Sequence, residues 1–440
     1  MTQVGSIRTL DLRGQSFDSL SANNLVPRAP LDISQAIGEI LPILEDVKNH
    51  GEEAITRSAL KFDQVDPNPI RVSIQELEEA LANLDPNLRA AIEESISRVR
   101  KVSEASMPNG NQVSLGNGAE VRLRWAPVDS VGLYVPGGKA VYPSSVVMNV
   151  VPAQVAGVKQ LSLATPPQKL FSGRPHPTVL ATAALLGVKN VYCMGGPSAI
   201  AAFAYGLTAV GLEPVSLVTG PGNIYVAAAK RALRGTVGID SEAGTTEILI
   251  IADSSANPRF IAADLISQAE HDESAAAVLV TDSVGLADSV RSELELLLST
   301  TKNSARVKKA LESQQSALVL VDDIAHAVRF ANFYATEHLE IHTRDNEKVL
   351  ESISNAGAIF IGEYSPVSLG DYLAGSNHVL PTGQQAKFGA GLGVHTFLRA
   401  QQVIEYDRSG LEQIASQAVD FSEAEGLPAH GQAITARFDS

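Results

Sequence analysis

Histidines beside acidic or amide side chains are the first candidates for chemistry in this sequence. Five of the nine histidines lie in such contexts: His271, His338, His378, His395 and His430. The chain has a single cysteine, Cys193, so a metal site built from several thiolates is excluded. Any metal would therefore be held by imidazole together with carboxylate or amide oxygen, a set of ligands that suits zinc and other divalent ions.

Two spacings in the sequence suggest ligand pairs. Gln268 and His271 are three residues apart in a segment that we expect to be helical, so both side chains would project from one face and could bind one ion. The same spacing also occurs at ordinary solvated helix ends. Asp371 and His378 lie seven residues apart between glycines and prolines, and there a ligand role and a turn-capping role are both open.

Glu337 and His338 are neighbouring candidates for general acid and base chemistry. Imidazole is the side chain whose ordinary pKa lies nearest neutrality, which suits it to proton transfer. Adjacent side chains on a strand or helix point apart, so the pair works only if both reach one pocket. A buried histidine beside an exposed glutamate is the alternative interpretation.

Glycine-rich segments follow two of the expected strands, at GLYVPGGKA from Gly132 and TGPGN from Thr219. Backbone N–H groups in such turns can approach the phosphates of a nucleotide. Neither segment matches the Walker A motif, and the chain contains no G-x-G-x-x-G motif. A nucleotide site here would be atypical, and ordinary tight turns explain the glycines equally well.

The elements that must position these residues alternate between apolar runs and helical patterns. From Ala153 onward, short apolar strands alternate with Ala-rich helices, as in a parallel sheet that is covered on both faces. A second unit of this kind begins with the strand TEILIIAD at Thr246 and a helix capped by Asn257. Helical patterns from Val284 to Leu298 and from Ile324 to Tyr334 separate its further strands.

The two ends of the chain differ from this alternation. The first hundred residues are expected to be mainly helical, because apolar residues recur there at helical spacing. A Gly-rich segment without clear periodicity follows Gly383, and a short helical pattern extends from Val419 to Asp439. We interpret the latter as a small C-terminal appendage.

Composition limits the class of protein. A chain of 440 residues with 45% hydrophobic residues can bury two or three cores. The net charge of −15 would repel nucleic acids and anionic lipid surfaces. The first residues lack a continuous apolar segment, and the longest apolar stretch, Val141 to Val158, is interrupted by prolines and amides. We therefore expect no membrane helix and a cytoplasmic location.

Six sequence blocks, in this order across nearly the whole chain, resemble the histidinol dehydrogenase family. They are GLYVPGGKAVYPSS, GPGNIYVAAAKR, SQAEHD, EHLEI, GDYLAGSNHVLPT and EGLPAH. Members of that family oxidise L-histidinol through L-histidinal to L-histidine in the last steps of histidine biosynthesis, with two molecules of NAD and a bound zinc. The resemblance implies the same activity here.

We expect an α/β fold with two Rossmann-like parallel-sheet domains, a small N-terminal helical arm and a C-terminal appendage. The arm is predicted at 1–27. The first domain is predicted to combine 28–133 with 246–391, and the second, NAD-binding domain to span 134–245. The appendage, 392–440, is predicted to contribute to the active site of a partner subunit.

The resemblance implies a zinc site and a substrate site that share residues. The four zinc ligands would be Gln268, His271, Asp371 and His430. The amino group and the imidazole of the substrate would complete the shell, so the metal would mainly position the substrate. The residues that would contact the substrate are Thr246, Gln268, His271, His338, Asp371, His378, Glu425 and His430. Because Glu425 and His430 lie in the tail, the resemblance implies a homodimer with shared sites.

The resemblance also assigns the catalytic roles. His338 would take the hydroxyl proton as hydride leaves for the nicotinamide, and Glu337 would activate water to hydrate the bound aldehyde. Tyr134, Ser198 and Asn223 would contact NAD.

Two positions depart from the family's usual pattern. Ser198 stands where a glutamine is usual, which puts the cofactor contacts in question. Thr246 stands where a serine is usual, and it keeps the hydroxyl group.

Two other functions compete with this interpretation. In the first, Cys193 is the nucleophile of an aldehyde dehydrogenase and forms a thioester, although its apolar context VYCMGG suggests a buried thiol. In the second, two α/β domains bind a ligand in the cleft between them without catalysis.

Overall fold

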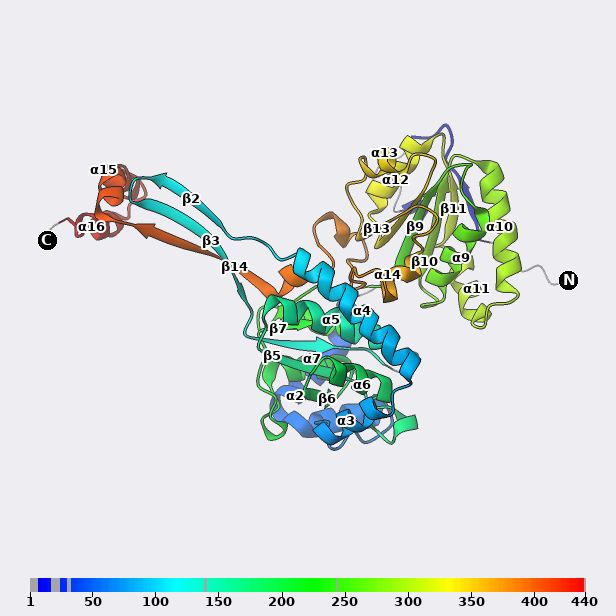
Figure 1. Ribbon diagram of the computed structural model, residues 1–440, viewed down its shortest axis with the longest axis horizontal. Coiled ribbons are helices and arrows are strands. Elements are labelled where there is room, and N and C mark those ends of the chain that lie inside the picture. Colours follow the sequence, from blue (N-terminus) through cyan, green and yellow to red (C-terminus); the bar gives the residue numbers. More distant parts are fainter. Residues whose placement is uncertain (1–6, 17–23, 30–32, 138–140, 243, 439–440) are drawn as a thin grey trace.

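Two parallel β-sheets, each covered by helices, form the body of the protein (Figure 1). The computed structural model describes residues 7–16, 24–29, 33–137, 141–242 and 244–438. Neighbouring strands in both sheets are parallel throughout, as the alternation of apolar strands and helices predicts. The expected α/β class with parallel sheets is therefore confirmed.

The six-stranded sheet has the order β1-β11-β10-β9-β12-β13. Its strands are β1 (Thr9–Asp11), β9 (Glu247–Ala252), β10 (Ala276–Thr281), β11 (Ala317–Leu320), β12 (His338–His342) and β13 (Ala358–Ile361). One face packs against α9 (Pro258–Ala269), α10 (Val284–Leu298) and α11 (Ser304–Glu312). The other packs against α12 (Ile324–Tyr334) and α13 (Asn346–Leu350). Helix α9 begins as predicted, with Asn257 as its cap and Pro258 in the first turn.

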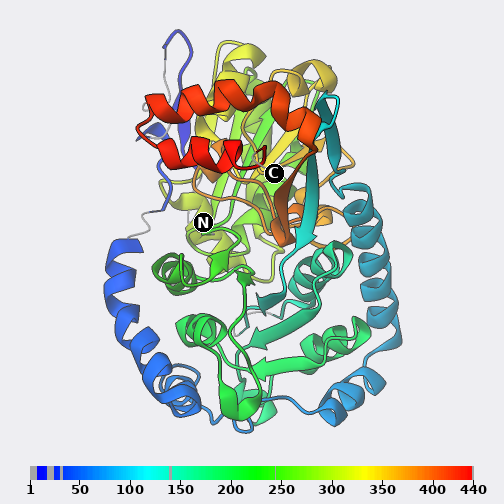
Figure 2. The ribbon, with the colours of Figure 1, turned by 90° about the vertical axis from the view of Figure 1, so that its left-hand side faces the viewer.

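The five-stranded sheet has the order β6-β5-β4-β7-β8. Its strands are β4 (Ser130–Tyr134), β5 (Gln160–Thr165), β6 (Asn190–Cys193), β7 (Leu217–Thr219) and β8 (Gly238–Ile239). On one face lie α2 (Ile33–Phe62), α7 (Gly196–Tyr205) and α8 (Ile224–Leu233). On the other lie α3 (Ile74–Ala82), α4 (Pro86–Ala105), α5 (Pro143–Ala156) and α6 (Pro177–Leu185). Figure 2 shows α2 and α4 on opposite sides of this sheet.

A three-stranded antiparallel sheet extends away from the body of the protein (Figure 1). It consists of β2 (Asn111–Gly116), β3 (Ala119–Pro127) and β14 (Leu398–Tyr406), in the order β14-β3-β2. At its far end lie α15 (Arg408–Ala424) and α16 (Pro428–Thr435), which pack against each other. The C-terminal appendage therefore has its own strand and two helices, whereas the sequence pattern predicted only a short helix.

The predicted domain boundary at residue 133 is wrong. Strand β4 pairs with β5 and β7 of the five-stranded sheet, and α2, α3 and α4 pack on the same sheet. Most of 28–133 thus belongs with 134–245, and the six-stranded unit is formed by 246–391 together with the N-terminal strand β1. The helical pattern showed that these helices bury an apolar face, but it did not show against which sheet.

The N-terminal segment also differs from the expected helical arm. Its described part contains β1, which pairs in parallel with β11 at the edge of the six-stranded sheet. Residues 1–6 and 17–23 of the predicted arm lie outside the described residues. Strand β12 was another element that the sequence patterns did not predict: its sequence HLEIH is a short alternation of polar and apolar residues, which is typical of a half-buried strand, whereas all five residues are buried.

No helix among the described residues is both long and apolar enough to cross a bilayer.

Candidate active site

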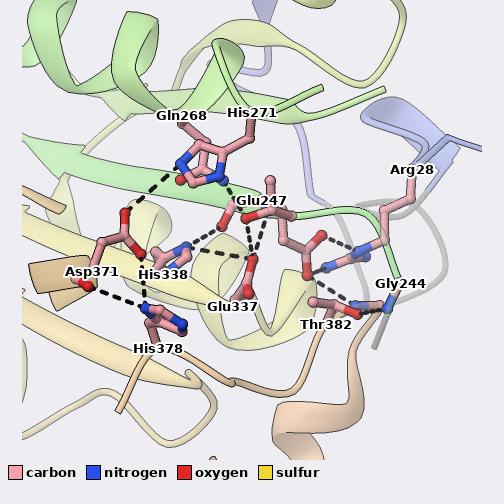
Figure 3. Close-up of polar contacts among 12 residues, drawn as sticks. Arg28, Gly244, Glu247, Gln268, His271, Glu337, His338, Asp371, His378 and Thr382 are labelled. Atoms are coloured by element: carbon pink, nitrogen blue, oxygen red, sulfur yellow. Dashed lines mark hydrogen bonds and ion pairs between the residues drawn. The ribbon is translucent and has the colours of Figure 1, made fainter. Parts of the chain in front are cut away.

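Several of the polar residues singled out in the sequence converge near the amino ends of β9 and β12 (Figure 3). Thr246 directly precedes β9, and Glu337 directly precedes β12, whose first residue is His338. Helix α9 runs back along the sheet from the far end of β9, so its last turn carries Gln268 to this same edge. The parallel topology therefore assembles residues that are 91 positions apart in the chain.

The Glu337 carboxylate is buried and held by two donors. Its Oε2 accepts hydrogen bonds from Thr246 Oγ1 at 2.5 Å and from the Glu247 backbone N–H at 2.9 Å. Burial raises the pKa of Glu337 to about 8. The two hydrogen bonds favour the charged form and lower the pKa, but the effect of burial is larger. This carboxyl group can therefore bind or release a proton near neutral pH.

His338 is oriented by the backbone of the neighbouring strand. Its Nδ1 lies 3.1 Å from the carbonyl oxygen of Glu247. Because a carbonyl can only accept, Nδ1 carries the ring proton and Nε2 is left as the basic nitrogen. Burial lowers the pKa of His338 below its ordinary value, which keeps the ring neutral at physiological pH.

Glu337 and His338 reach the same pocket even though they are adjacent in sequence. Nδ1 of His338 lies 3.5 Å from Oε2 of Glu337, and both side chains are buried. Glu337 precedes the first residue of β12, so the alternation of a regular strand does not apply to this pair. The alternative of a buried histidine beside an exposed glutamate is therefore wrong.

Three of the four expected zinc ligands lie together beside these two residues (Figure 3). The amide nitrogen of Gln268 donates to Thr246 Oγ1 at 2.5 Å, which leaves the amide oxygen as a possible ligand. Nε2 of His271 lies 3.8 Å from Oδ2 of Asp371. Two donors that are each about 2.0–2.1 Å from one zinc ion are separated by about 3–4 Å, so this separation is compatible with a shared ion.

The local structure around two of these ligands differs from the expectation. His271 lies just beyond α9, which ends at Ala269, and its backbone N–H still bonds to the carbonyl of Gln268. Asp371 lies within the short helix α14 (Val367–Tyr372) and not in a loop. A turn-capping role for Asp371 is therefore excluded.

The fourth expected ligand, His430, lies far from the other three within this chain. It is part of α16, at the outer end of the three-stranded sheet, and it is exposed. Glu425, at the end of α15, is exposed in the same appendage. One chain therefore brings together Gln268, His271 and Asp371 but neither tail residue.

His378 lies on the other side of Asp371, where it links the two sheet units. Its Nδ1 is 3.2 Å from the Asp371 carbonyl oxygen, and its Nε2 is 3.2 Å from the hydroxyl of Ser145 in α5. Burial lowers the pKa of His378, so the ring is neutral. Ser145 was not identified from the sequence, where it is one of many serines without a distinctive neighbour.

The three expected NAD contacts lie at the carboxyl ends of strands in the five-stranded sheet. Tyr134 ends β4, and its hydroxyl accepts a hydrogen bond from Gly196 N at 3.0 Å. Ser198, in the first turn of α7, is buried and donates to the Gly195 carbonyl at 2.8 Å. Asn223 is exposed and caps α8. This edge is where nucleotides bind in open parallel sheets; Gly138 and Lys139 of the nearby glycine-rich segment lie outside the described residues.

Glu247 supports both catalytic candidates, and sequence reasoning assigned it no role. Its backbone N–H bonds Glu337 while its carbonyl bonds His338. Its own carboxylate is buried and bonds to Arg28 Nε at 2.5 Å and to Gly383 N at 3.1 Å. The only signal in the sequence is a single acidic residue at the start of an apolar strand. Arg28 carries no such signal.

A cavity of about 330 Å³ opens next to Thr246, between the two sheet units. It is lined by residues from both units, among them Arg28, Arg231, Thr245 and Thr382. Small molecules commonly bind in such clefts between domains.

Cys193 is not placed to act as a nucleophile. The thiol is fully buried at the end of β6, and its sulfur donates to the Gly173 carbonyl at 3.0 Å. Burial raises the pKa of this thiol to about 12, so it is not a thiolate at neutral pH. The thioester mechanism weighed above is thus incompatible with the structure.

Comparisons with known proteins agree on one family. The family model described as histidinol dehydrogenase matches residues 26–438. The histidinol dehydrogenase of Leifsonia xyli subsp. xyli is 55% identical over 98% of this chain and 99% of its own length. That of Thermobifida fusca is 56% identical over 98% of this chain and 97% of its own length. The crystal structure of histidinol dehydrogenase from Elizabethkingia anophelis matches with a TM-score of 0.91 at 33% identity, over 98% of each chain.

Proposed function

The chain belongs to the histidinol dehydrogenase family, and from this premise we propose that it oxidises L-histidinol through L-histidinal to L-histidine. The reaction removes four electrons in two steps, with NAD as the acceptor and zinc as the resident metal. The observation that carries the proposal is the buried pair of Glu337 and His338, which lies beside the converging oxygen and nitrogen donors of Gln268, His271 and Asp371.

In the first step, His338 acts as the general base. Its unprotonated Nε2 takes the proton of the substrate hydroxyl while the carbon transfers a hydride. The product of this step is the aldehyde, and the proton remains on the imidazole ring. The Glu247 carbonyl, which holds Nδ1, keeps the ring in the required tautomer and stabilises the imidazolium that forms.

In the second step, Glu337 acts on water. Its carboxylate takes a proton from a water molecule as the oxygen adds to the aldehyde carbon, and the resulting hydrate loses a second hydride and a proton to become the carboxylic acid. A pKa of about 8 allows this group to accept and return the proton near neutral pH. The Thr246 hydroxyl, shared between Glu337 and Gln268, keeps the carboxylate next to the substrate-binding residues.

The donors fit the expected metal. Gln268, His271 and Asp371 would hold zinc through an amide oxygen, an imidazole nitrogen and a carboxylate oxygen, and His430 of a second subunit would complete the protein ligands. Bound zinc would fix the substrate's amino and imidazole nitrogens and so position the reacting carbon. Neutral His378 and Thr246 would contact the substrate from within the chain, and Glu425 from the second subunit.

The five-stranded sheet would hold the cofactor. Tyr134, Ser198 and Asn223 lie at its carboxyl edge, the edge at which nucleotides bind in open parallel sheets. NAD, when bound there, would accept the hydride from the substrate. We further infer that the enzyme works as a homodimer with shared sites in the cytoplasm.

A direct assay tests this function. The purified protein is mixed with zinc, NAD and L-histidinol, and absorbance of the reduced nicotinamide is followed. We expect about two molecules of NADH per histidinol consumed, and we expect a chelator to abolish the signal. A non-catalytic binding protein would bind histidinol without forming any NADH, and this outcome would reject the proposal.

A further inference from the structure

A second group of buried ionisable side chains lies behind the proposed active site. It comprises Asp264 on α9 and Glu340 and His342 on β12. One donor atom from each residue lies within 4.8 Å of the other two, and the three residues are at most 6% exposed. None of them has a role in the reaction described above. Burying three such groups is costly unless they are paired, so their arrangement calls for an explanation.

Glu340 is the centre of this group and connects three elements. Its Oε1 accepts a hydrogen bond from the backbone N–H of Val367, the first residue of α14, at 2.7 Å. Its Oε2 lies 3.3 Å from Nε2 of His342, and its carboxyl group is hydrogen-bonded to that of Asp264. Helix α9, strand β12 and helix α14 therefore meet at one fully buried side chain.

Each of these three elements also carries a residue of the proposed active site. On each element, the site residue and the residue of the buried group are separated by a similar length of backbone. Asp264 is four residues before Gln268 on α9, and Val367 is four residues before Asp371 on α14. Glu340 is two residues after His338 on β12. Four helical residues advance about 6 Å and two strand residues about 6.6 Å, and both spacings keep side chains on one face. The group thus forms a layer directly beneath the site.

The hydrogen bonds within this layer are complete without a bound ion. Burial, with the nearby charge of Glu340, raises the pKa of Asp264 to about 8, so Asp264 keeps its proton at neutral pH and donates it to Glu340. The Val367 N–H and the His342 ring supply the other donors. One carboxylate with three donors is a satisfied arrangement, which argues against a second metal ion at this place.

We propose that Glu340 is a positioning residue, which sets the relative heights of α9, β12 and α14 and thereby the separations among Gln268, Asp371 and His338. The inference rests on the proposed function, because it concerns the zinc ligands and the base of that reaction. Groups that orient metal ligands from behind typically change metal affinity or activity by about 10–100-fold when they are altered.

The first test compares Glu340→Gln with Asp264→Asn in the full-length protein. Zinc affinity is measured by competition with a chromophoric chelator, and kcat and KM for NAD are measured at saturating zinc. Glu340→Gln removes the central charge, and we expect zinc affinity and kcat to fall by about 10–100-fold with KM for NAD unchanged. Asp264→Asn keeps a neutral donor at its position and should stay within about threefold of the unaltered protein.

A second variant tests the link to α14 without touching a carboxylate. Val367→Pro removes the N–H that bonds Glu340 at a helix position where proline is favoured, and it also replaces a buried apolar side chain. Val367→Ala, which keeps the N–H, is its matched control. The preceding Pro366 has φ −63° and ψ 147°, which is compatible with a following proline. We expect the same loss of zinc affinity as in Glu340→Gln. This variant keeps the proposal testable if Glu340→Gln does not fold.

Val290→Ala serves as the control for simple destabilisation. Val290 is fully buried in α10, in the apolar core on the same face of the sheet, and it is not one of the proposed site residues. The substitution Val290→Ala should lower the melting temperature and leave the zinc affinity unchanged. If Glu340→Gln and Val367→Pro behave like this control, the positioning role is refuted.

Three further outcomes would also overturn the inference. Metal analysis that finds two zinc ions per chain, and one in Glu340→Gln, would identify the layer as a second metal site. If the unaltered protein binds zinc and forms NADH while both variants match it, this inference alone fails. If the unaltered protein does neither, the proposed function fails with it.

Discussion

Burial and backbone contacts, more than residue type, make Glu337 and His338 suitable for proton transfer. Both side chains are buried, which raises the pKa of Glu337 and lowers the pKa of His338, so that burial favours the neutral form of each group. The backbone of Glu247 then contacts both, with its N–H on the carboxylate and its carbonyl on the imidazole. The two adjacent residues are therefore suited to the different tasks that we propose, because Glu247 holds one through its N–H and the other through its carbonyl.

The base can be tested by substituting His338. In His338→Ala we expect kcat for histidinol to fall by about 10²- to 10⁴-fold, because the hydroxyl proton has no acceptor. The zinc content should not change, since His338 is not one of the proposed ligands. NADH formation and metal content are measured on the same preparation. His50→Ala, an exposed histidine on α2, is the control, and full activity in His338→Ala would reject the assignment.

The pKa of Glu337 predicts how stability depends on pH. The folded-state pKa of about 8 lies above the ordinary value of 4.5. Between these values the unfolded chain binds fewer protons at this position than the folded chain, so stability falls as pH rises through this window. Glu337→Gln removes this dependence. We expect its melting temperature, in metal-free protein, to exceed that of the unaltered protein by an amount that grows toward pH 8. A constant difference across the window would contradict the prediction.

At the scale of elements, the site forms at an unusual edge of the six-stranded sheet. Ligands in open parallel sheets usually bind at the carboxyl ends of the strands, and the proposed NAD contacts follow this rule in the five-stranded sheet. The proposed catalytic residues lie instead at the amino ends of β9 and β12. The start of β9 must therefore be held in place, and Arg28 does this through Glu247.

Removing this support should affect both stability and activity. Arg28→Met leaves the Glu247 carboxylate buried without its main partner, and loss of one member of a buried pair costs about 3–5 kcal/mol. Denaturant unfolding measures the loss, and kcat should fall because the backbone of Glu247 shifts. The double variant Arg28→Met with Glu247→Gln should recover most of the stability. An Arg28→Met protein as stable as the original would show that the pair is dispensable.

At the scale of the whole molecule, the outer end of the appendage, α15 and α16, stands apart from the two parallel sheets (Figure 1). The helices α15 and α16 pack mainly on each other, and Phe421 is 70% exposed and Ile404 68% exposed. His430 and Glu425 lie on this appendage, far from the three gathered donors of the same chain. A second copy of the chain that supplies these two residues would bury the apolar surface and complete the site.

Complementation between two inactive variants tests this arrangement. His338→Ala and His430→Ala are each expected to be inactive as pure proteins. If sites are shared, mixed dimers contain one site with both original residues, so random exchange of subunits should restore about a quarter of the original activity. Co-expression with two affinity tags allows the mixed dimer to be isolated and assayed. Absence of recovery in that isolated dimer would place His430 and His338 of one chain in the same site.

The sequence by itself determined part of the local structure and the kind of chemistry. The bounds of α10 and α12 and the start of α9 follow from apolar spacing and capping residues, which act over a few neighbours. The six sequence blocks identified the family, and the residue types at Gln268, His271 and Asp371 limited the metal to one that accepts nitrogen and oxygen.

The tertiary structure alone decided which of these elements meet. An apolar stripe shows that α2 to α4 must be buried, but their pairing with the five-stranded sheet depends on contacts between distant segments. The same holds for β12, where buried Glu340 contacts His342 and accepts a hydrogen bond from the Val367 N–H, and for Arg28, which reaches Glu247 across 219 positions of the chain. Periodicity shows that a segment must bury an apolar face, but only the folded chain shows which distant segments cover that face and which distant groups pair with its buried polar residues.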